Sequence, residues 1–146
     1  MRRLRRDGDR ESGMSTLEVV LLAPLVIGFV MFLVCFGVLV DARGTVQGAA
    51  RDAARMGSLQ RDDATANSSA YAAAVADLGN TCNGPVQVQQ VDPDSKVPST
   101  AFAAGQLYTI KVTCTVSLTG LDWFTIGSQT IVSYSAAPLD VFRRTN

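Results

Sequence analysis

An apolar run at residues 17–40 constrains this chain more than any other feature, because Glu18 is its only charged residue. A helix of this length, 24 residues, spans about 36 Å, which exceeds the roughly 30 Å hydrocarbon core of a bilayer. Pro24 and two glycines are compatible with a membrane helix. A cleaved secretory signal is the alternative, but its apolar part would be only about 7–15 residues long. We therefore predict a single-pass membrane anchor over residues 14–40.

The flanks of the anchor differ in charge. Residues 1–13 contain five arginines, whereas the charges that directly follow the apolar run nearly cancel. The positive-inside rule therefore predicts a cytoplasmic N-terminus, with residues 41–146 outside the cell membrane. We expect a basic leader without regular structure at 1–13, a helix extension at 41–61 and an extracytoplasmic α+β domain at 62–146.

The anchor helix is predicted to continue to about Leu59. One face of the extension carries small apolar residues at helical spacing: Val46, Ala49, Ala50, Ala53 and Gly57. Another carries polar side chains at steps of four: Arg43, Gln47, Arg51 and Arg55. The small-residue stripe suits close packing, either on the chain's own domain or on a neighbouring subunit, and the sequence leaves both open.

The remainder predicts one more helix and a small antiparallel sheet. Asp62 or Asp63, or else the serines at 68 and 69, are candidate caps for the helix, which ends at Gly79. Alternating residues then predict strands at 86–91, 107–119 and 129–136, with a turn at 92–95. In the longest strand one face is apolar: Tyr108, Ile110, Val112, Cys114, Val116 and Leu118.

Cys82 and Cys114 both lie in the predicted external domain. A pair of cysteines in an exported domain indicates a disulfide, and two free thiols are the alternative. Cys35 lies in the apolar run, where it acts as a small hydrophobic residue.

The composition argues against an enzyme. The chain has no His, which removes the commonest general base and metal ligand. No phosphate loop, dinucleotide fingerprint or nucleophile motif is present, and two cysteines without His make a poor zinc site. We expect no cofactor, no metal and no small-molecule substrate. The balance of 13 basic and 13 acidic residues also gives no reason to expect a nucleic-acid partner.

Glu18 needs a reason to stand at the head of an apolar helix. Its cost is about 2.5–3.5 kcal/mol at the bilayer centre and less near the end. One explanation is that a carboxylate in the first helical turn favours the helix dipole. The other is that a cationic partner neutralises it in an assembly.

The N-terminal pattern resembles the signal of type IV pilin-like proteins: a basic leader, Gly13, a carboxylate five residues later and an apolar helix. Residues 15–25, STLEVVLLAPL, with a proline six residues after Glu18, are most similar to the TadE-like proteins of tight-adherence (Flp) pilus systems. Residues 47–55, QGAARDAAR, resemble the Ala/Arg-rich segment that follows the anchor in that family.

The resemblance implies a non-enzymatic minor pseudopilin. A prepilin peptidase would cut between Gly13 and Met14, and Glu18 would pair with the new amine of Met14 in an adjacent subunit. Its partners would be other pilin or pseudopilin subunits and the pilus assembly machinery, and the chain would remain in the cell membrane or enter a pilus. The alternative is an unprocessed, membrane-anchored binding module that uses the exposed face of its sheet.

Overall fold

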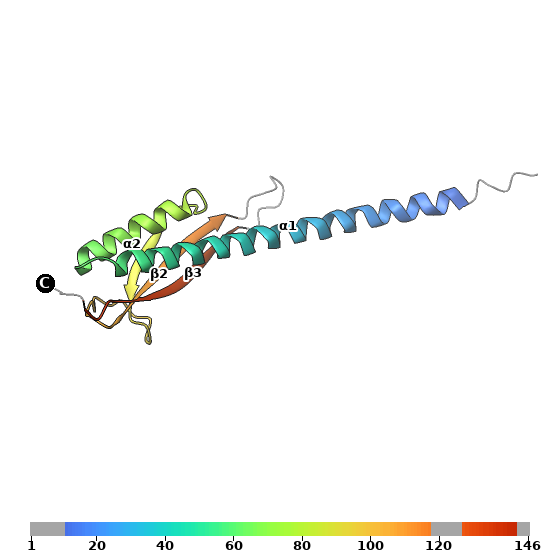
Figure 1. The fold of residues 1–146 in the computed structure, drawn as a ribbon. Coiled ribbons are helices and arrows are strands. Elements are labelled where there is room, and N and C mark those ends of the chain that lie inside the picture. Colours follow the sequence, from blue (N-terminus) through green and yellow to red (C-terminus); the bar gives the residue numbers. More distant parts are fainter. Residues whose placement is uncertain (1–10, 118–126, 143–146) are drawn as a thin grey trace, which may run out of the picture. The chain divides into compact units, whose positions relative to one another are not determined.

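The computed structural model describes residues 11–117 and 127–142, with side chains from Glu18 onward. It contains helices α1 (Glu11–Ser58) and α2 (Asp63–Leu78), followed by strands β1 (Gln87–Val91), β2 (Leu107–Ser117) and β3 (Ser128–Pro138) (Figure 1). The strands form an antiparallel sheet in the order β1-β2-β3. The predicted α+β fold, with a long N-terminal helix, a short second helix and a small antiparallel sheet, is confirmed.

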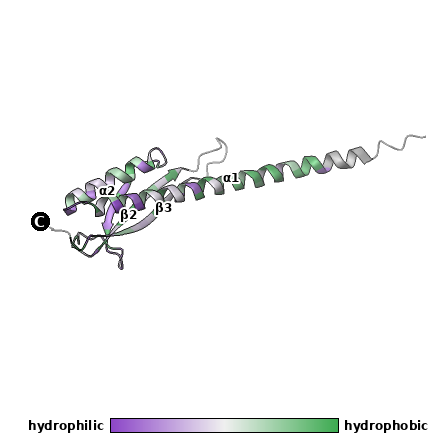
Figure 2. Ribbon diagram, viewed as in Figure 1, coloured by the Kyte–Doolittle hydropathy of each residue, from purple (hydrophilic) through white to green (hydrophobic). Residues whose placement is uncertain are grey.

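The chain divides into two compact units, one ending at Gly37 and the other beginning at Val38. In the first unit, the described part of α1 is largely hydrophobic (Figure 2). Its large apolar side chains are exposed, with Val20 and Leu25 each 70% exposed. The second unit contains the rest of α1 together with α2 and the sheet. The helix extension is therefore part of the folded domain that follows it.

The ends of α2 follow from local hydrogen bonds. Asp62 is the N-cap, and its carboxylate accepts a hydrogen bond from the backbone N–H of Thr65 at 2.9 Å. At the other end, Gly79 adopts a positive φ of 47° and donates its N–H to the Val75 carbonyl. The cap at Asp62 is confirmed, whereas the serines at 68 and 69 lie inside the helix. An aspartate at the cap satisfies a backbone donor that a helix cannot satisfy itself.

The alternation predicted for the longest strand is confirmed over β2. Its inward residues are almost fully buried: Tyr108, Ile110, Val112, Cys114 and Val116. The strand is described as far as Ser117, so the predicted positions 118 and 119 lie outside the described residues.

The opposite face of the sheet is not wet throughout. Thr109 is only 2% exposed, although it points away from the core. It pairs with Val91, and Val91 forms a bridge with Pro98 of the connection to β2. From the same connection, Lys96 places its Nζ atom 5.6 Å from the Tyr134 ring. The long β1–β2 connection thus covers one end of a face that alternation alone predicts to be solvated.

The core consists largely of alanine on the helices and larger residues on the sheet. Three alanines of α2 are fully buried, at positions 66, 70 and 74. They share one cluster with the buried face of α1 and the inward face of β2. Every residue of the predicted small-residue stripe is buried: Val46, Ala49, Ala50, Ala53 and Gly57. Of the two partners that the sequence left open, the stripe packs on the chain's own domain.

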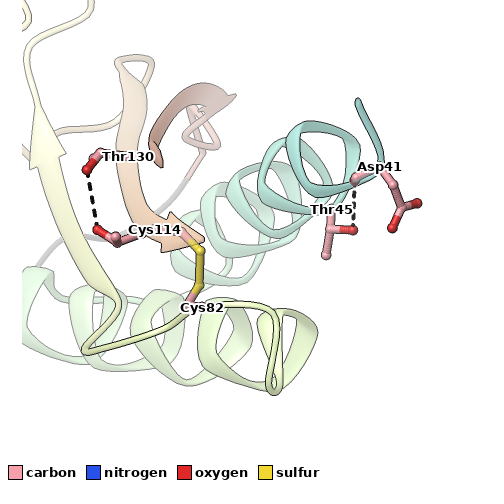
Figure 3. Close-up of a disulfide and its surroundings, with 6 residues drawn as sticks. Asp41, Thr45, Cys82, Cys114 and Thr130 are labelled. Atoms are coloured by element: carbon pink, nitrogen blue, oxygen red, sulfur yellow. Dashed lines mark hydrogen bonds between the residues drawn. A yellow bond between two sulfur atoms is a disulfide. The ribbon is translucent and has the colours of Figure 1, made fainter. Parts of the chain in front are cut away.

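A disulfide joins Cys82, in the loop after α2, to Cys114 in β2 (Figure 3). The two Cα atoms lie 5.4 Å apart, and Cys114 is fully buried. The bridge ties the end of α2 to the inward face of the central strand, as the sequence predicted. The alternative of two free thiols is therefore set aside, while Cys35 is free.

Candidate assembly segment

The predicted processing site lies within α1. Gly13 and Met14 both belong to this helix, which begins at Glu11. The expectation that residues 1–13 lack regular structure is therefore wrong for the last three of them. The apolar run that follows favours a helix, because backbone groups in a membrane must form their hydrogen bonds within the segment. The helix continues from this run back to Glu11. The side chains of both residues lie outside the described set.

Glu18 is exposed at the head of the apolar part of α1. It stands seven residues after the first described residue of the helix, which places it beyond the first turn. The favourable effect of the helix dipole falls off within that turn. A helix-dipole explanation of Glu18 therefore does not fit the uncut chain. In a chain that begins at Met14, Glu18 would be the fifth residue, closer to the helix N-terminus but still just past its first turn.

Among the described residues, the first unit consists of α1 alone, so the apolar part of this helix packs on no other segment there. Over the described residues, the stretch between Glu18 and Ser58 is long and apolar enough to cross a membrane, and its apolar window is entirely unburied. Pro24 lies inside the helix and has no N–H, so the carbonyl of Val20 loses its usual donor. This is tolerable in membrane helices, where proline is common. The segment is suited to a single-pass anchor whose surface is covered by lipid or by other helices.

Beyond the anchor, the Ala/Arg-rich segment divides between core and solvent. Ala49, Ala50 and Ala53 face the core, whereas Arg51 and Arg55 are exposed on the opposite side. The alanines allow α1, α2 and the sheet to approach closely. The arginines remain on the surface of the domain.

A close approach fixes the end of α1 on the sheet. The buried Tyr108 ring lies so near Gly57 that an added Cβ atom would come 2.2 Å from its Cε1 atom. The tyrosine hydroxyl donates to Oδ1 of Asn67 at 2.9 Å, and Asn67 donates in turn to Asp63 at 3.1 Å. Burial, together with the charge of Asp63, raises the pKa of Tyr108. One tyrosine therefore connects α1, α2 and β2.

Two carboxylates meet between the helices. Burial raises the pKa of Asp77 in α2, and the charge of Asp52 in α1 and a side-chain hydrogen bond with it raise that pKa further. Two like charges at one place disfavour ionisation of the second. The two helices therefore bring two acidic side chains together at this contact.

The turn after β1 is held together by hydrogen bonds to the Asp92 side chain. Asp92 accepts hydrogen bonds from the backbone N–H groups of Asp94 and Ser95 and from the Ser95 hydroxyl. These bonds, chiefly those from Ser95, lower the pKa of Asp92. In the described part of the chain, no cluster of three or more His, Cys, Asp or Glu residues could hold a metal ion.

Two of these contacts were missing from the sequence-based prediction. The Tyr108–Gly57 approach joins residues far apart in the chain, and the only signal for it was a glycine in the last turn of a predicted helix. The Asp52–Asp77 pair lies on two helices whose relative rotation the sequence does not determine. Both depend on how α1 and α2 pack.

The family model described as "TadE-like protein" matches residues 13–55. The matched segment contains Gly13, Met14, Glu18, the apolar run and the whole Ala/Arg-rich segment at 47–55. No curated protein and no solved structure matches the chain. The match confirms the resemblance of this segment to the TadE-like proteins of tight-adherence pilus systems.

Proposed function

We propose that the chain is a minor, non-enzymatic pseudopilin that takes part in assembling a tight-adherence pilus, where it initiates, caps or regulates the fibre. The family match supports an association with such a pilus in general. The observation that carries the finer proposal is the position of Glu18, an exposed carboxylate at the head of an otherwise apolar helix surface.

The proposed chemistry is an intersubunit ion pair. A prepilin peptidase cuts between Gly13 and Met14 on the cytoplasmic face, which leaves the anchor attached and creates an amine at Met14. Glu18 of one subunit then pairs with that amine in its neighbour. In an apolar surrounding, an unpaired carboxylate is costly, so a cationic partner stabilises the assembled state over the separate subunits.

The orientation follows from the same arrangement. The arginine-rich leader stays in the cytoplasm, α1 crosses the cell membrane once, and the domain from Val38 onward lies outside. An exported domain agrees with the disulfide between Cys82 and Cys114, because disulfides persist in oxidising compartments.

The experiment has two parts, both in cells with an active prepilin peptidase. First, the intact mass of the membrane-extracted protein should correspond to a chain that begins at Met14. A mature chain that still begins at Met1 would contradict the processing step. Second, Glu18→Ala and the isosteric Glu18→Gln should both be cleaved normally and fail to co-purify with pilus subunits. The control is Thr16→Ala, a nearby change that keeps the carboxylate and should assemble.

Normal assembly of Glu18→Gln would show that the charge is not used. Co-purification of the uncut wild-type chain with an external ligand, and not with pilus subunits, would favour a membrane-anchored binding module instead.

A further inference from the structure

The exposed face of α1 beyond the anchor has two edges of opposite charge. The basic edge consists of Arg43, Arg51 and Arg55, with Gln47 between them, and all four side chains are exposed. Successive steps of four residues keep these side chains on one side of the helix. Arg43 and Gln47 line a groove together with residues 129–133 of β3. The basic edge therefore borders the β3 side of the domain.

The acidic edge consists of Asp41 and Asp52 on α1 and Asp77 on α2. The two α1 residues are eleven positions apart, about three helical turns, so they lie on one line along the helix. Figure 3 shows the Asp41 carboxylate pointing away from the disulfide and the sheet. Asp52 lies beside Asp77, so the acidic edge borders the α2 side of the domain.

Among the residues that the structure describes, neither edge is neutralised by ion pairs within its own molecule. In residues 18–117 and 127–142, none of the three arginines of the basic edge forms an ion pair with a carboxylate. On the acidic edge, the charge that acts on Asp77 is that of another carboxylate, Asp52. Each edge has the charge that the other lacks.

Two glycines, Gly44 and Gly48, lie on the same side of α1 as these charged residues. A Cβ atom added to Gly44 or to Gly48 meets nothing within 4 Å. The packing of the chain itself thus gives no reason for their small size, in contrast to Gly57 under the Tyr108 ring. Small residues four positions apart on a helix surface allow a second helix to approach closely. At the two glycines, this face has no side chains that would keep a second helix away, and charged side chains lie around them.

We propose that this face docks a second copy of the chain, with the basic edge of one copy (Arg43, Arg51, Arg55) against the acidic edge of the next (Asp41, Asp52, Asp77). Copies anchored through α1 in one membrane are parallel, so residues of similar number lie at the same level. Asp41 then faces Arg43, while Asp52 and Asp77 face Arg51 and Arg55. Because the two edges differ, a dimer leaves one basic edge and one acidic edge unused. Further copies can bind to these edges, so the association extends beyond a dimer.

The inference rests on the proposed function in one respect, namely that α1 anchors every copy in the same membrane. Its test needs no pilus machinery. The full-length chain, labelled at its C-terminus with a donor or an acceptor fluorophore, is reconstituted in lipid vesicles at low density, and energy transfer between copies is measured. The basic-edge variant is Arg51→Glu with Arg55→Glu, and the acidic-edge variant is Asp52→Arg with Asp77→Arg.

Each variant alone places like charges opposite one another. We expect the surface density needed for half-maximal transfer to rise about ten-fold for each, as two attractive contacts become repulsive. The two variants mixed together restore complementary charges at every contact, so transfer should return to the wild-type level. A single chain with all four reversals should also associate as wild type. Raising the salt to about 1 M, where the screening length is near 3 Å, should weaken the wild-type association.

The control reverses charges elsewhere in the domain, Lys111→Glu and Asp94→Lys, and should leave transfer unchanged. Disulfide formation and circular dichroism verify that each variant folds. Wild-type-like transfer in both single-edge variants, or no recovery in the mixture and in the four-reversal chain, would overturn the proposal. So would wild-type transfer no higher than that of an unrelated single-pass peptide. Failure of processing or of pilus assembly in cells, with the vesicle results intact, would contradict only the pilus function.

Discussion

Replacing Gly57 by alanine tests how closely α1 packs on the sheet. The added Cβ atom would come 2.2 Å from Cε1 and 2.8 Å from Cζ of the Tyr108 ring. The ring has little room to move, because its hydroxyl is bonded to Asn67 and Phe102 packs edge-on at a centroid distance of 5.6 Å. The clash therefore has to be relieved by shifting α1 or the strand.

The expected magnitude combines two opposing effects. Inserting a methyl group into a well-packed core costs typically about 1–3 kcal/mol. Alanine is more favourable than glycine inside a helix by up to about 1 kcal/mol. A contact this short, however, puts the overpacking cost at the upper end of the roughly 1–3 kcal/mol range. We expect Gly57→Ala to lower the free energy of unfolding by about 1–2 kcal/mol, with a fall in Tm of roughly 4–8 °C for each kcal/mol.

The assay is thermal unfolding of the full-length chain in detergent micelles, monitored by near-ultraviolet circular dichroism. Gly48→Ala is the matched control, because its Cβ atom meets nothing within 4 Å, and it should stabilise the helix by up to about 1 kcal/mol. Adding Tyr108→Leu to Gly57→Ala should cost less than the two separate effects together, as residues in contact couple. If Gly57→Ala behaves like Gly48→Ala, the close approach of α1 to Tyr108 is wrong.

Two further predictions concern the domain's stability. Replacing Cys82 and Cys114 together by alanine should destabilise it by about 3–4 kcal/mol, since the bridge closes a separation of 32 residues, and a reducing agent should lower the Tm of wild type but not of the variant. Asp77→Asn should raise the free energy of unfolding near pH 7 by a few tenths of a kcal/mol, because it removes repulsion from Asp52 while an amide still reaches that carboxylate. The pKa of Asp77 is raised in the folded protein, so the folded state keeps this proton to a higher pH than the unfolded state does. Wild type therefore gains stability as the pH falls toward 3.8, and the stability advantage of Asp77→Asn should shrink there. Chemical denaturation of both proteins between about pH 3.5 and about pH 7 measures this, and an advantage that does not change with pH would contradict it.

Much of the fold could be predicted because the signals are local. The apolar run, the aspartate cap of α2 and the two-residue alternation of β2 each express the periodicity or hydrogen bonding of a few neighbouring residues. The disulfide was also predictable, because only two cysteines lie outside the apolar run and β2 places Cys114 on its buried face.

The remaining features depend on packing between distant segments. The stripe from Val46 to Gly57 has the same pattern whether it faces its own domain or a neighbouring subunit, and only the arrangement of α2 and the sheet decides between them. Thr109 is buried because the β1–β2 connection returns over its end of the sheet. Likewise, the contact between Asp52 and Asp77 depends on how the two helices are rotated about their axes.

Because the small-residue stripe is buried in the chain's own core, its residues are not available to bind another subunit. The alanines that make the Ala/Arg-rich segment conspicuous are used in holding α1 to its own domain. A subunit that docks here must therefore bind the opposite side of the helix, where the surface offers charged side chains and two glycines. The apolar part of α1 differs, because its large side chains are exposed on all sides and Glu18 is the only charged residue between positions 17 and 40. If α1 anchors neighbouring copies in one membrane, as we propose, it presents a single costly carboxylate to them in lipid and two complementary charged edges in water, where ion pairs are weak individually and selective in combination.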